Sequence, residues 1–170
     1  EELSVKQDVF ANIEQFIAED AILATNTSSL SVNEIGAKLK HPERLVGFHF
    51  FNPVAVMPLV EVVNAPHTNE VALATAMDTA KKLGKTAVIT TDSPGFVVNR
   101  LLARLLGEAM HAVDTGTSFK TVDESVASFG MPMAPFELLD LVGLKVGAHV
   151  LDTHHAAFPD RFFRSDNLHK

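Results

Sequence analysis

The sequence predicts an α/β region followed by an all-α region. In residues 1–93, short apolar or β-branched runs alternate with segments of helical periodicity, the pattern of a sheet whose strands are connected by helices. From residue 94 onward the periodicity is helical throughout, and Gly or Pro stands at each junction. The change falls at the DSPG segment that begins at Asp92, so we expect one domain in 1–93 and a second in 94–170.

The first expected element is a helix in residues 2–19. Its apolar residues recur at steps of three and four, which predicts one buried stripe: Val5, Val9, Ile13, Phe16 and Ile17. The apolar run 21–25 then predicts a short strand that ends at a polar loop, 26–29. Ser31 and Glu34 have the spacing of a capping box, so a second helix is expected to begin there.

Two strands that carry ionisable residues are expected next. Residues 44–51 are apolar after Arg44 except for His49, which suits a strand covered on both faces, and Asn52 followed by proline ends the run. Residues 59–63 form a β-branched run interrupted by one carboxylate, Glu61. A buried charge needs a partner, so Glu61 requires an explanation.

The α/β region is expected to finish with a helix and a strand. Residues 69–83 have helical periodicity, and Gly84 is the residue type that ends helices. Residues 86–90 then form a β-branched run of strand length.

The second region is expected to hold one long helix and three shorter ones, at 122–129, 135–142 and 146–157. The long helix spans about residues 96–113, and its apolar stripe is wide: Val97, Val98, Leu101, Leu102, Leu105, Leu106, Ala109, Met110 and Val113. This stripe is broader than one buried face needs, which predicts a symmetric dimer. The chain does not begin with Met, and residues 161–170 have a weak pattern. We therefore expect an excised segment of a longer protein, with an incomplete helical domain.

Composition excludes several classes of function. Lys and Arg number 14 against 21 Asp and Glu, a net charge of −7, so the chain has no basic surface for nucleic acid. No apolar run reaches the roughly 18 residues of a membrane span, and the start is unlike a secretory signal, which predicts a cytoplasmic protein. The absence of cysteine excludes disulfides, thiolate metal sites and cysteine nucleophiles. The histidines lack the spacing of a metal site, and no metal is expected.

Three groups of residues could carry chemistry. The polar loop after the first strand lies where open α/β sheets bind ligands, although Asn, Thr and Ser are also common in ordinary capped turns. His49 and Glu61 are both embedded in apolar strands, and their burial costs least if they face each other. The carboxylate would then fix the imidazole tautomer and leave the other ring nitrogen as a base, or the pair would only stabilise packing. Asn99 could hold a ligand oxygen or merely solvate a helix end.

Five stretches together resemble the L-3-hydroxyacyl-CoA dehydrogenase family. They are NTSSL at 26–30, HFFNP at 49–53, VEVV at 60–63, DSPGFVVNRLL at 92–102 and PFELLDLVGL at 135–144. The resemblance covers essentially the whole chain. It implies the C-terminal part of a Rossmann-like NAD-binding domain, followed by the start of a helical dimerisation domain. The boundary segment and the ending FFRSDNLHK are similar to the dehydrogenase part of multifunctional α-subunits of bacterial fatty-acid oxidation.

The resemblance implies roles for individual residues. His49 matches the family's catalytic histidine and Glu61 the glutamate paired with it. Ser28 matches the serine that contacts the substrate's 3-oxygen beside the nicotinamide, and Asn99 matches the asparagine that completes this pocket.

The resemblance also implies roles for four further residues. Asn26 matches a loop position near the nicotinamide, and Glu1 and Lys6 match positions that contact the cofactor. Asn52 is expected to support the histidine loop and to contribute to substrate binding.

The implied activity is NAD-dependent oxidation of L-3-hydroxyacyl-CoA to 3-oxoacyl-CoA in fatty-acid β-oxidation. The implied partners are a second copy of the chain, bound through the helical domain, and a thiolase subunit of a β-oxidation complex. No G-x-G-x-x-G motif occurs in the 170 residues, so this chain alone is expected to be inactive, and the sequence does not distinguish NAD from NADP. A related hydroxyacid dehydrogenase and a non-catalytic dimerisation module remain as alternatives.

Overall fold

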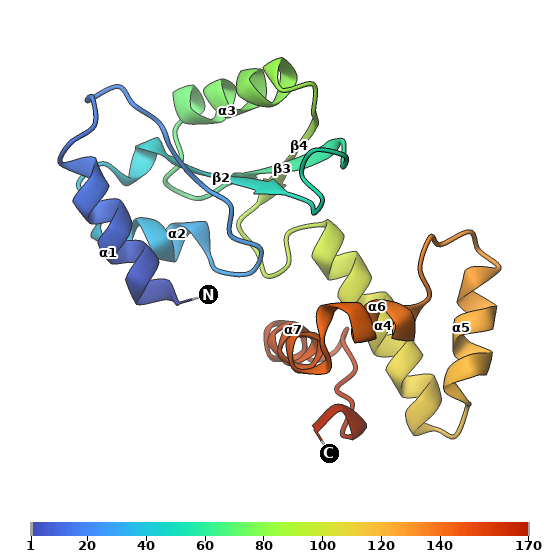
Figure 1. Ribbon diagram of the computed structural model, residues 1–170. Helices are drawn as coiled ribbons and strands as arrows, with labels where there is room; N and C mark the ends of the chain where they lie inside the picture. Colours follow the sequence, from blue (N-terminus) through green and yellow to red (C-terminus); the bar gives the residue numbers. More distant parts are fainter. Residues whose placement is uncertain (1, 170) are drawn as a thin grey trace. The chain divides into compact units, whose positions relative to one another are not determined.

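The computed structural model describes residues 2–169 and divides into two compact units, Glu1–Val97 and Val98–Lys170 (Figure 1). The first unit contains three α-helices, α1 (Leu3–Glu14), α2 (Val32–Ile35) and α3 (Glu70–Lys82), and four strands, β1 (Leu23–Thr25), β2 (Leu45–Phe50), β3 (Leu59–Asn64) and β4 (Thr86–Thr91). The second contains α4 (Val98–Asp114), α5 (Phe119–Ala127), α6 (Pro135–Val142) and α7 (Leu144–Ala157). Short 3₁₀ turns occur at Gly36–Lys38, Pro42–Arg44 and Asn167–His169. An α/β region followed by an all-α region is therefore confirmed.

The four strands form one sheet in the order β1-β2-β3-β4. β1 pairs with β2 in parallel, β2 with β3 antiparallel, and β3 with β4 in parallel. The reversal between β2 and β3 follows from their connection of eight residues, since a parallel pair needs a crossover of a dozen or more.

Helices cover both faces of the sheet (Figure 1). α3 packs on one face through its alanines, which lie against Val46, Phe48, Val60 and Val62 of the two central strands. α2 lies on the other face, where Val32 and Ile35 join Leu45, Val63 and Phe96 in a second cluster. β2 is buried along nearly its whole length, as its apolar run predicts.

Local sequence explains where the helices begin and end. The side chain of Ser31 accepts the Glu34 amide at the start of α2, as the capping-box spacing predicts. The Asn69 side chain accepts the Ala72 amide at the start of α3, and Gly84 follows that helix with a left-handed φ of 69°.

The buried stripe predicted for the first helix is wrong at four of its five residues. Phe16 lies beyond the end of α1 and is 87% exposed, and Val5, Val9 and Ile13 are exposed as well. The first helix instead packs against the core through Leu3 and Phe10, with Ile17 after its end. It also stops at Glu14, and β1 begins two residues later than the apolar run does. The helical period was right, but the period alone does not say which face meets the rest of the unit.

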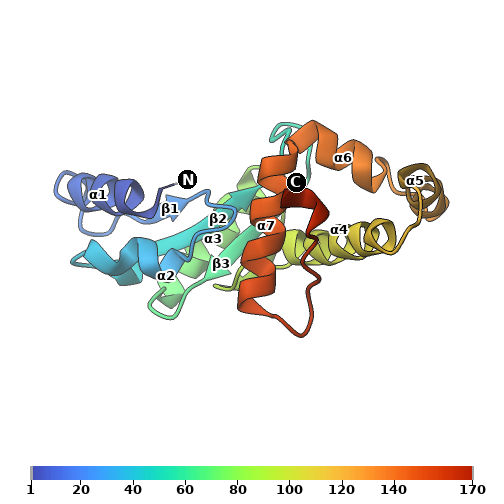
Figure 2. The same ribbon diagram turned by 90° about the horizontal axis from the view of Figure 1, so that it is seen from below.

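The second unit has its own core around α4. This helix buries Ala103, Leu106, Gly107, Ala109 and Met110, and its core contains Leu139 of α6, Leu151 of α7 and Phe162. α7 crosses α4, as Figure 2 shows. Leu101, within the stripe predicted for this helix, is 68% exposed. None of the helices in the described part of the chain has the length and apolar character needed to span a bilayer.

Candidate active site

His49 and Glu61 form a hydrogen-bonded pair across two antiparallel strands. They are direct partners in the register of β2 and β3, which places both side chains on the same face of the sheet. His49 Nδ1 lies 2.9 Å from Glu61 Oε2. His49 is 5% exposed and Glu61 is 1% exposed, so the pair is shielded from solvent. The contact expected from two costly burials is present.

The second carboxylate oxygen of Glu61 is held by the backbone. Val97 donates its amide hydrogen to Glu61 Oε1 at 2.9 Å. An ionised carboxylate only accepts hydrogen bonds, so with both oxygens engaged it requires a proton on His49 Nδ1. Nε2 is then the nitrogen that can accept or release a proton, which is the arrangement of a general base.

Two aromatic rings flank the imidazole. The ring centroid of Phe51 lies 4.7 Å from that of His49, and the centroid of Phe96 lies 5.6 Å away. Phe96 is 2% exposed, and its φ of 46° falls in the left-handed region that non-glycine residues seldom adopt. Both rings pack against the imidazole.

The loop that carries Ser28 lies at the carboxyl ends of the parallel strands β1 and β2. Asn26 Oδ1 accepts the amide hydrogen of Phe50 at 2.9 Å and so joins the two strand ends. The hydroxyl of fully buried Thr27 accepts the Leu30 amide at 3.0 Å, which tightens the turn around half-buried Ser28. Strand ends of this kind are where open α/β sheets bind ligands.

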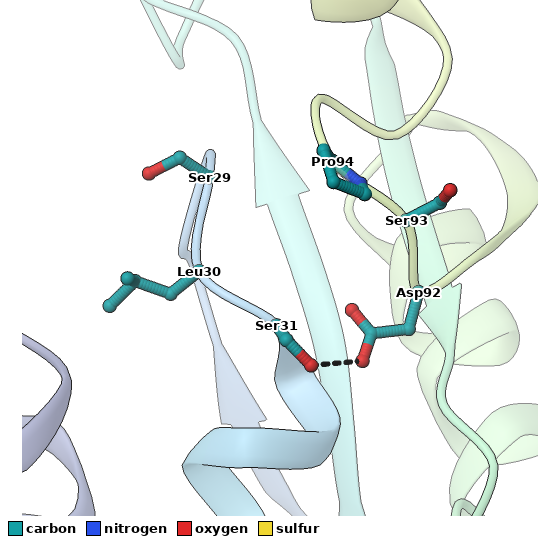
Figure 3. A pocket seen from close by; sticks show the side chains of 6 residues that line it. All are labelled: Ser29, Leu30, Ser31, Asp92, Ser93 and Pro94. Carbon is teal, nitrogen blue, oxygen red and sulfur yellow. Dashed lines mark hydrogen bonds between the residues drawn. The ribbon is translucent and has the colours of Figure 1, made fainter. Parts of the chain in front are cut away.

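Asp92 ties the end of the sheet to the start of α2. Its carboxylate accepts hydrogen bonds from the Ser31 hydroxyl at 2.7 Å and from the amides of Val32 and Asn33 at 3.0 and 2.8 Å. Figure 3 shows this contact beside a small pocket of about 50 Å³, lined by Ser29, Leu30, Ser31, Asp92, Ser93 and Pro94. The pocket has room for a few water molecules at most.

The other predicted site residues belong to several different elements. Asn99 belongs to the second unit, in the first turn of α4. Lys6 is a half-buried residue of α1, and Asn52 is exposed in the turn that follows β2, before a cis peptide bond to Pro53. Glu1 is outside the described residues.

Sequence reasoning missed three contributors to the site. The Phe96 ring and the Val97 amide come from residues that were expected to begin the long helix, and the Asp92 carboxylate comes from the segment interpreted as the domain boundary. The Pro-Gly pair within it was a signal for a turn, but a turn motif does not reveal which carboxylate its amide will meet. Within residues 2–169, no group of three or more His, Cys, Asp or Glu side chains is placed to hold a metal ion.

Comparisons with known proteins agree on one family. Residues 1–93 match the family model described as 3-hydroxyacyl-CoA dehydrogenase, NAD binding domain, and residues 95–170 match the C-terminal domain of the same family. A fatty acid oxidation complex subunit alpha from Pseudomonas entomophila (strain L48) is 47% identical over 157 residues, which cover 92% of this chain and 22% of that protein. The chain thus spans about a fifth of the length of these relatives.

Two solved structures have the same fold over nearly the whole chain. The crystal structure of M. tuberculosis FadB2 is 39% identical with a TM-score of 0.92, covering 99% of this chain and 61% of that one. The crystal structure of (S)-3-hydroxybutyryl-CoA dehydrogenase PaaH1 from Ralstonia eutropha is 32% identical with a TM-score of 0.94, at the same coverage.

Proposed function

The chain belongs to the 3-hydroxyacyl-CoA dehydrogenase family, and from this we propose that it supplies the proton-transfer centre of an NAD-dependent 3-hydroxyacyl-CoA dehydrogenase. The reaction oxidises L-3-hydroxyacyl-CoA to 3-oxoacyl-CoA in fatty-acid oxidation. The observation that carries the proposal is the Glu61 carboxylate, held by the Val97 amide and bonded to His49 Nδ1. This arrangement leaves Nε2 of His49 to act as the base.

The proposed chemistry needs one proton acceptor and two groups that hold oxygen. His49 Nε2 takes the proton of the 3-hydroxyl as the hydride leaves C3, and in the reverse direction the imidazolium returns a proton to the forming alkoxide. Ser28 and Asn99 hold the 3-oxygen, which contributes orientation. Glu61 positions the imidazole and stabilises its charged form. Asn52 supports the turn after the histidine strand and contributes to substrate binding.

The residues at the sheet edge fit the nicotinamide end of NAD. The Asn26 and Ser28 side chains lie at the carboxyl ends of two parallel strands, and amide and hydroxyl groups suit a carboxamide and a ribose. We assign Asn26, Ser28 and Lys6, with Glu1, to cofactor binding. When bound, NAD accepts the hydride from the substrate.

Two protein partners are part of the proposal. The exposed apolar residues of α4, α6 and α7, which include Leu101, Leu141 and Leu144, favour a homodimer through the helical unit. The relatives named as fatty acid oxidation complex subunits favour assembly into a complex of several subunits, and we propose a thiolase subunit as the second partner.

The test is a pair of substitutions in the full-length protein that contains this sequence. We expect His49→Gln to lower turnover with acetoacetyl-CoA and NADH by at least ~10²-fold, with little change in melting temperature. Glu61→Gln should do the same, since an amide cannot accept from Val97 and His49 at once and its NH₂ would reverse the imidazole tautomer.

His67→Gln is the matched control. It makes the same change at a half-buried histidine of the first unit that bonds to the Asn33 side chain instead of to a carboxylate. Its turnover should stay near that of the wild-type protein. Near-normal turnover of His49→Gln at saturating substrate would refute the assignment.

A further inference from the structure

The segment Asp92–Val97, called the brace below, connects β4 to α4, and hydrogen bonds hold both of its ends. At its first residue, the Asp92 carboxylate accepts three hydrogen bonds at 2.7, 3.0 and 2.8 Å, all from the first residues of α2 and its cap. The bond from the Ser31 hydroxyl is drawn in Figure 3. At its last residue, the Val97 amide donates to Glu61 Oε1 at 2.9 Å. The brace therefore links the loop that leads from Ser28 into α2 with the His49–Glu61 pair.

A turn inside the brace directs the Phe96 ring toward His49 and the Val97 amide toward Glu61. The Phe96 amide bonds to the Ser93 carbonyl at 2.9 Å, and Gly95 and Phe96 have φ angles of 71° and 46°. Two successive left-handed residues turn the chain sharply, so the Phe96 ring reaches His49 while the next amide reaches Glu61.

A left-handed phenylalanine persists only where its surroundings hold it. Phe96 is 2% exposed and packs in the cluster that contains Val32 and Ile35 of α2 and Val63 of β3. Burial of the ring thus maintains a backbone conformation that a residue with a Cβ disfavours in isolation. The strained residue contacts His49, and backbone strain of this kind is concentrated at functional sites.

We propose that the brace is a positioning device that holds the Glu61 carboxylate and the His49 imidazole in their reactive orientation. Val97 fixes the carboxylate, Phe96 limits rotation of the imidazole, and Asp92 anchors the brace to the Ser28 loop. In the proposed reaction none of the three transfers a proton or a hydride. The inference rests on the proposed function, because orientation of the pair matters for turnover only if His49 is the base.

Two substitutions with matched controls test the turn in the full-length protein. Gly95→Ala adds a Cβ at a left-handed residue of the brace, and Gly84→Ala does so at a left-handed residue after α3, in open space. Phe96→Leu removes the ring beside His49. Phe48→Leu removes a buried ring that contacts Phe50 in the cluster between the sheet and α3. We expect kcat to fall about 10-fold or more for both brace variants, with KM little changed, and neither control to lose kcat.

A third pair tests the anchor. Asp92→Asn removes the charge and one of the acceptor oxygens at the start of α2, while Asp78→Asn changes an exposed aspartate paired with Lys82 on α3. The Asp92→Asn substitution should lower kcat, and Asp78→Asn should leave it unchanged. Equal kcat in the two variants would contradict a role for Asp92.

Proton NMR of the 170-residue chain gives a readout that does not depend on activity. In the wild-type chain, the His49 Nδ1 proton bonded to a buried carboxylate should give a low-field, slowly exchanging signal. Gly95→Ala and Phe96→Leu should weaken or abolish it, and Gly84→Ala and Phe48→Leu should retain it. Where His49→Gln abolishes turnover, brace variants that keep both the signal and kcat, or lose only one of them, show that the brace does not position the pair.

Failure of the proposed function would look different. In that case the wild-type protein shows no turnover, or His49→Gln is as active as His67→Gln. The NMR signal alone then decides whether the brace orients the pair.

Discussion

The histidines of this chain differ in the groups to which their ring nitrogens form hydrogen bonds. His49 faces a carboxylate, whereas His154 Nδ1 lies 2.7 Å from the Val150 carbonyl and His67 Nδ1 lies 2.8 Å from the Asn33 side-chain oxygen. The Nε2 atoms of His154 and His67 are buried without a hydrogen-bond partner among the described residues. A neutral imidazole tolerates this environment and an imidazolium does not, so these two residues are structural.

Stability of the helical unit should therefore depend on pH through His154. Burial, the largest effect, lowers the pKa of His154 below its ordinary value of about 6.5, Arg100 lowers it further, and the Val150 carbonyl opposes the shift. The unfolded chain then binds the proton more readily than the folded chain does. Stability should be complete above the unfolded pKa and decline as the pH falls below about 6.5 toward the folded pKa.

Urea denaturation followed by far-UV circular dichroism measures this effect, since the chain has no Trp or Tyr. His154→Gln should lower stability at neutral pH but flatten its decline between about pH 7 and pH 5. His149→Gln makes the same change at an exposed histidine of α7 and should retain the wild-type slope. An unchanged slope in His154→Gln would assign the pH dependence to other groups, of which His67 is the next candidate because burial also lowers its pKa.

At the scale of elements, β2 and α2 meet at a glycine. Gly47 lies opposite Val63 in the β2–β3 register, on the same face as His49. A Cβ at Gly47 would lie 2.5 Å from Val63 Cβ and 3.0 Å from Val32 Cγ2. The missing side chain thus lets α2 approach the sheet beside the His49–Glu61 pair.

Gly47→Ala should destabilise the first unit by about 1–3 kcal/mol, because neither the strand nor the helix can yield without losing its packing. Gly107→Ala is the matched control within α4. There a Cβ meets nothing closer than 3.7 Å, and the better helix former should leave stability unchanged or raise it by up to ~1 kcal/mol. Thermal unfolding of the two variants measures the difference, and equal melting temperatures would contradict the close approach of α2.

At the scale of the whole molecule, the proposed function gives this chain one edge of a dinucleotide site. The strand ends and the Ser28 loop suit the nicotinamide, but the 170 residues contain no glycine-rich turn to receive a pyrophosphate at a helix N-terminus. The longest helix of the first unit, α3, follows β3 through an Asn69 cap and no G-x-G-x-x-G motif.

The 170-residue chain alone should therefore fold but neither bind NAD measurably nor oxidise 3-hydroxyacyl-CoA. Titration calorimetry with NAD and a spectrophotometric assay with acetoacetyl-CoA and NADH test both parts. The full-length protein that contains this sequence is the positive control. Tight binding of NAD by the 170-residue chain would show that the cofactor site lies within these residues and is built differently.

Much of this molecule was determined by its sequence through local rules. Period-2 and period-3.6 patterns, the Ser31 cap and Gly84 predict the strands and helices because they act within a few residues. The pairing of His49 with Glu61 was also accessible, since two ionisable groups in apolar strands need a common explanation.

Other features were decided only by the tertiary structure. The exposed face of α1, with Phe16 beyond its end, depends on which surface the rest of the unit offers, and hydrophobic spacing carries no such information. The Val97 amide and the left-handed Phe96 became part of the site because a segment 36 residues beyond Glu61 folds back onto it. A backbone amide is the same in every residue, so only the course of the chain in space selects the one that holds a given carboxylate.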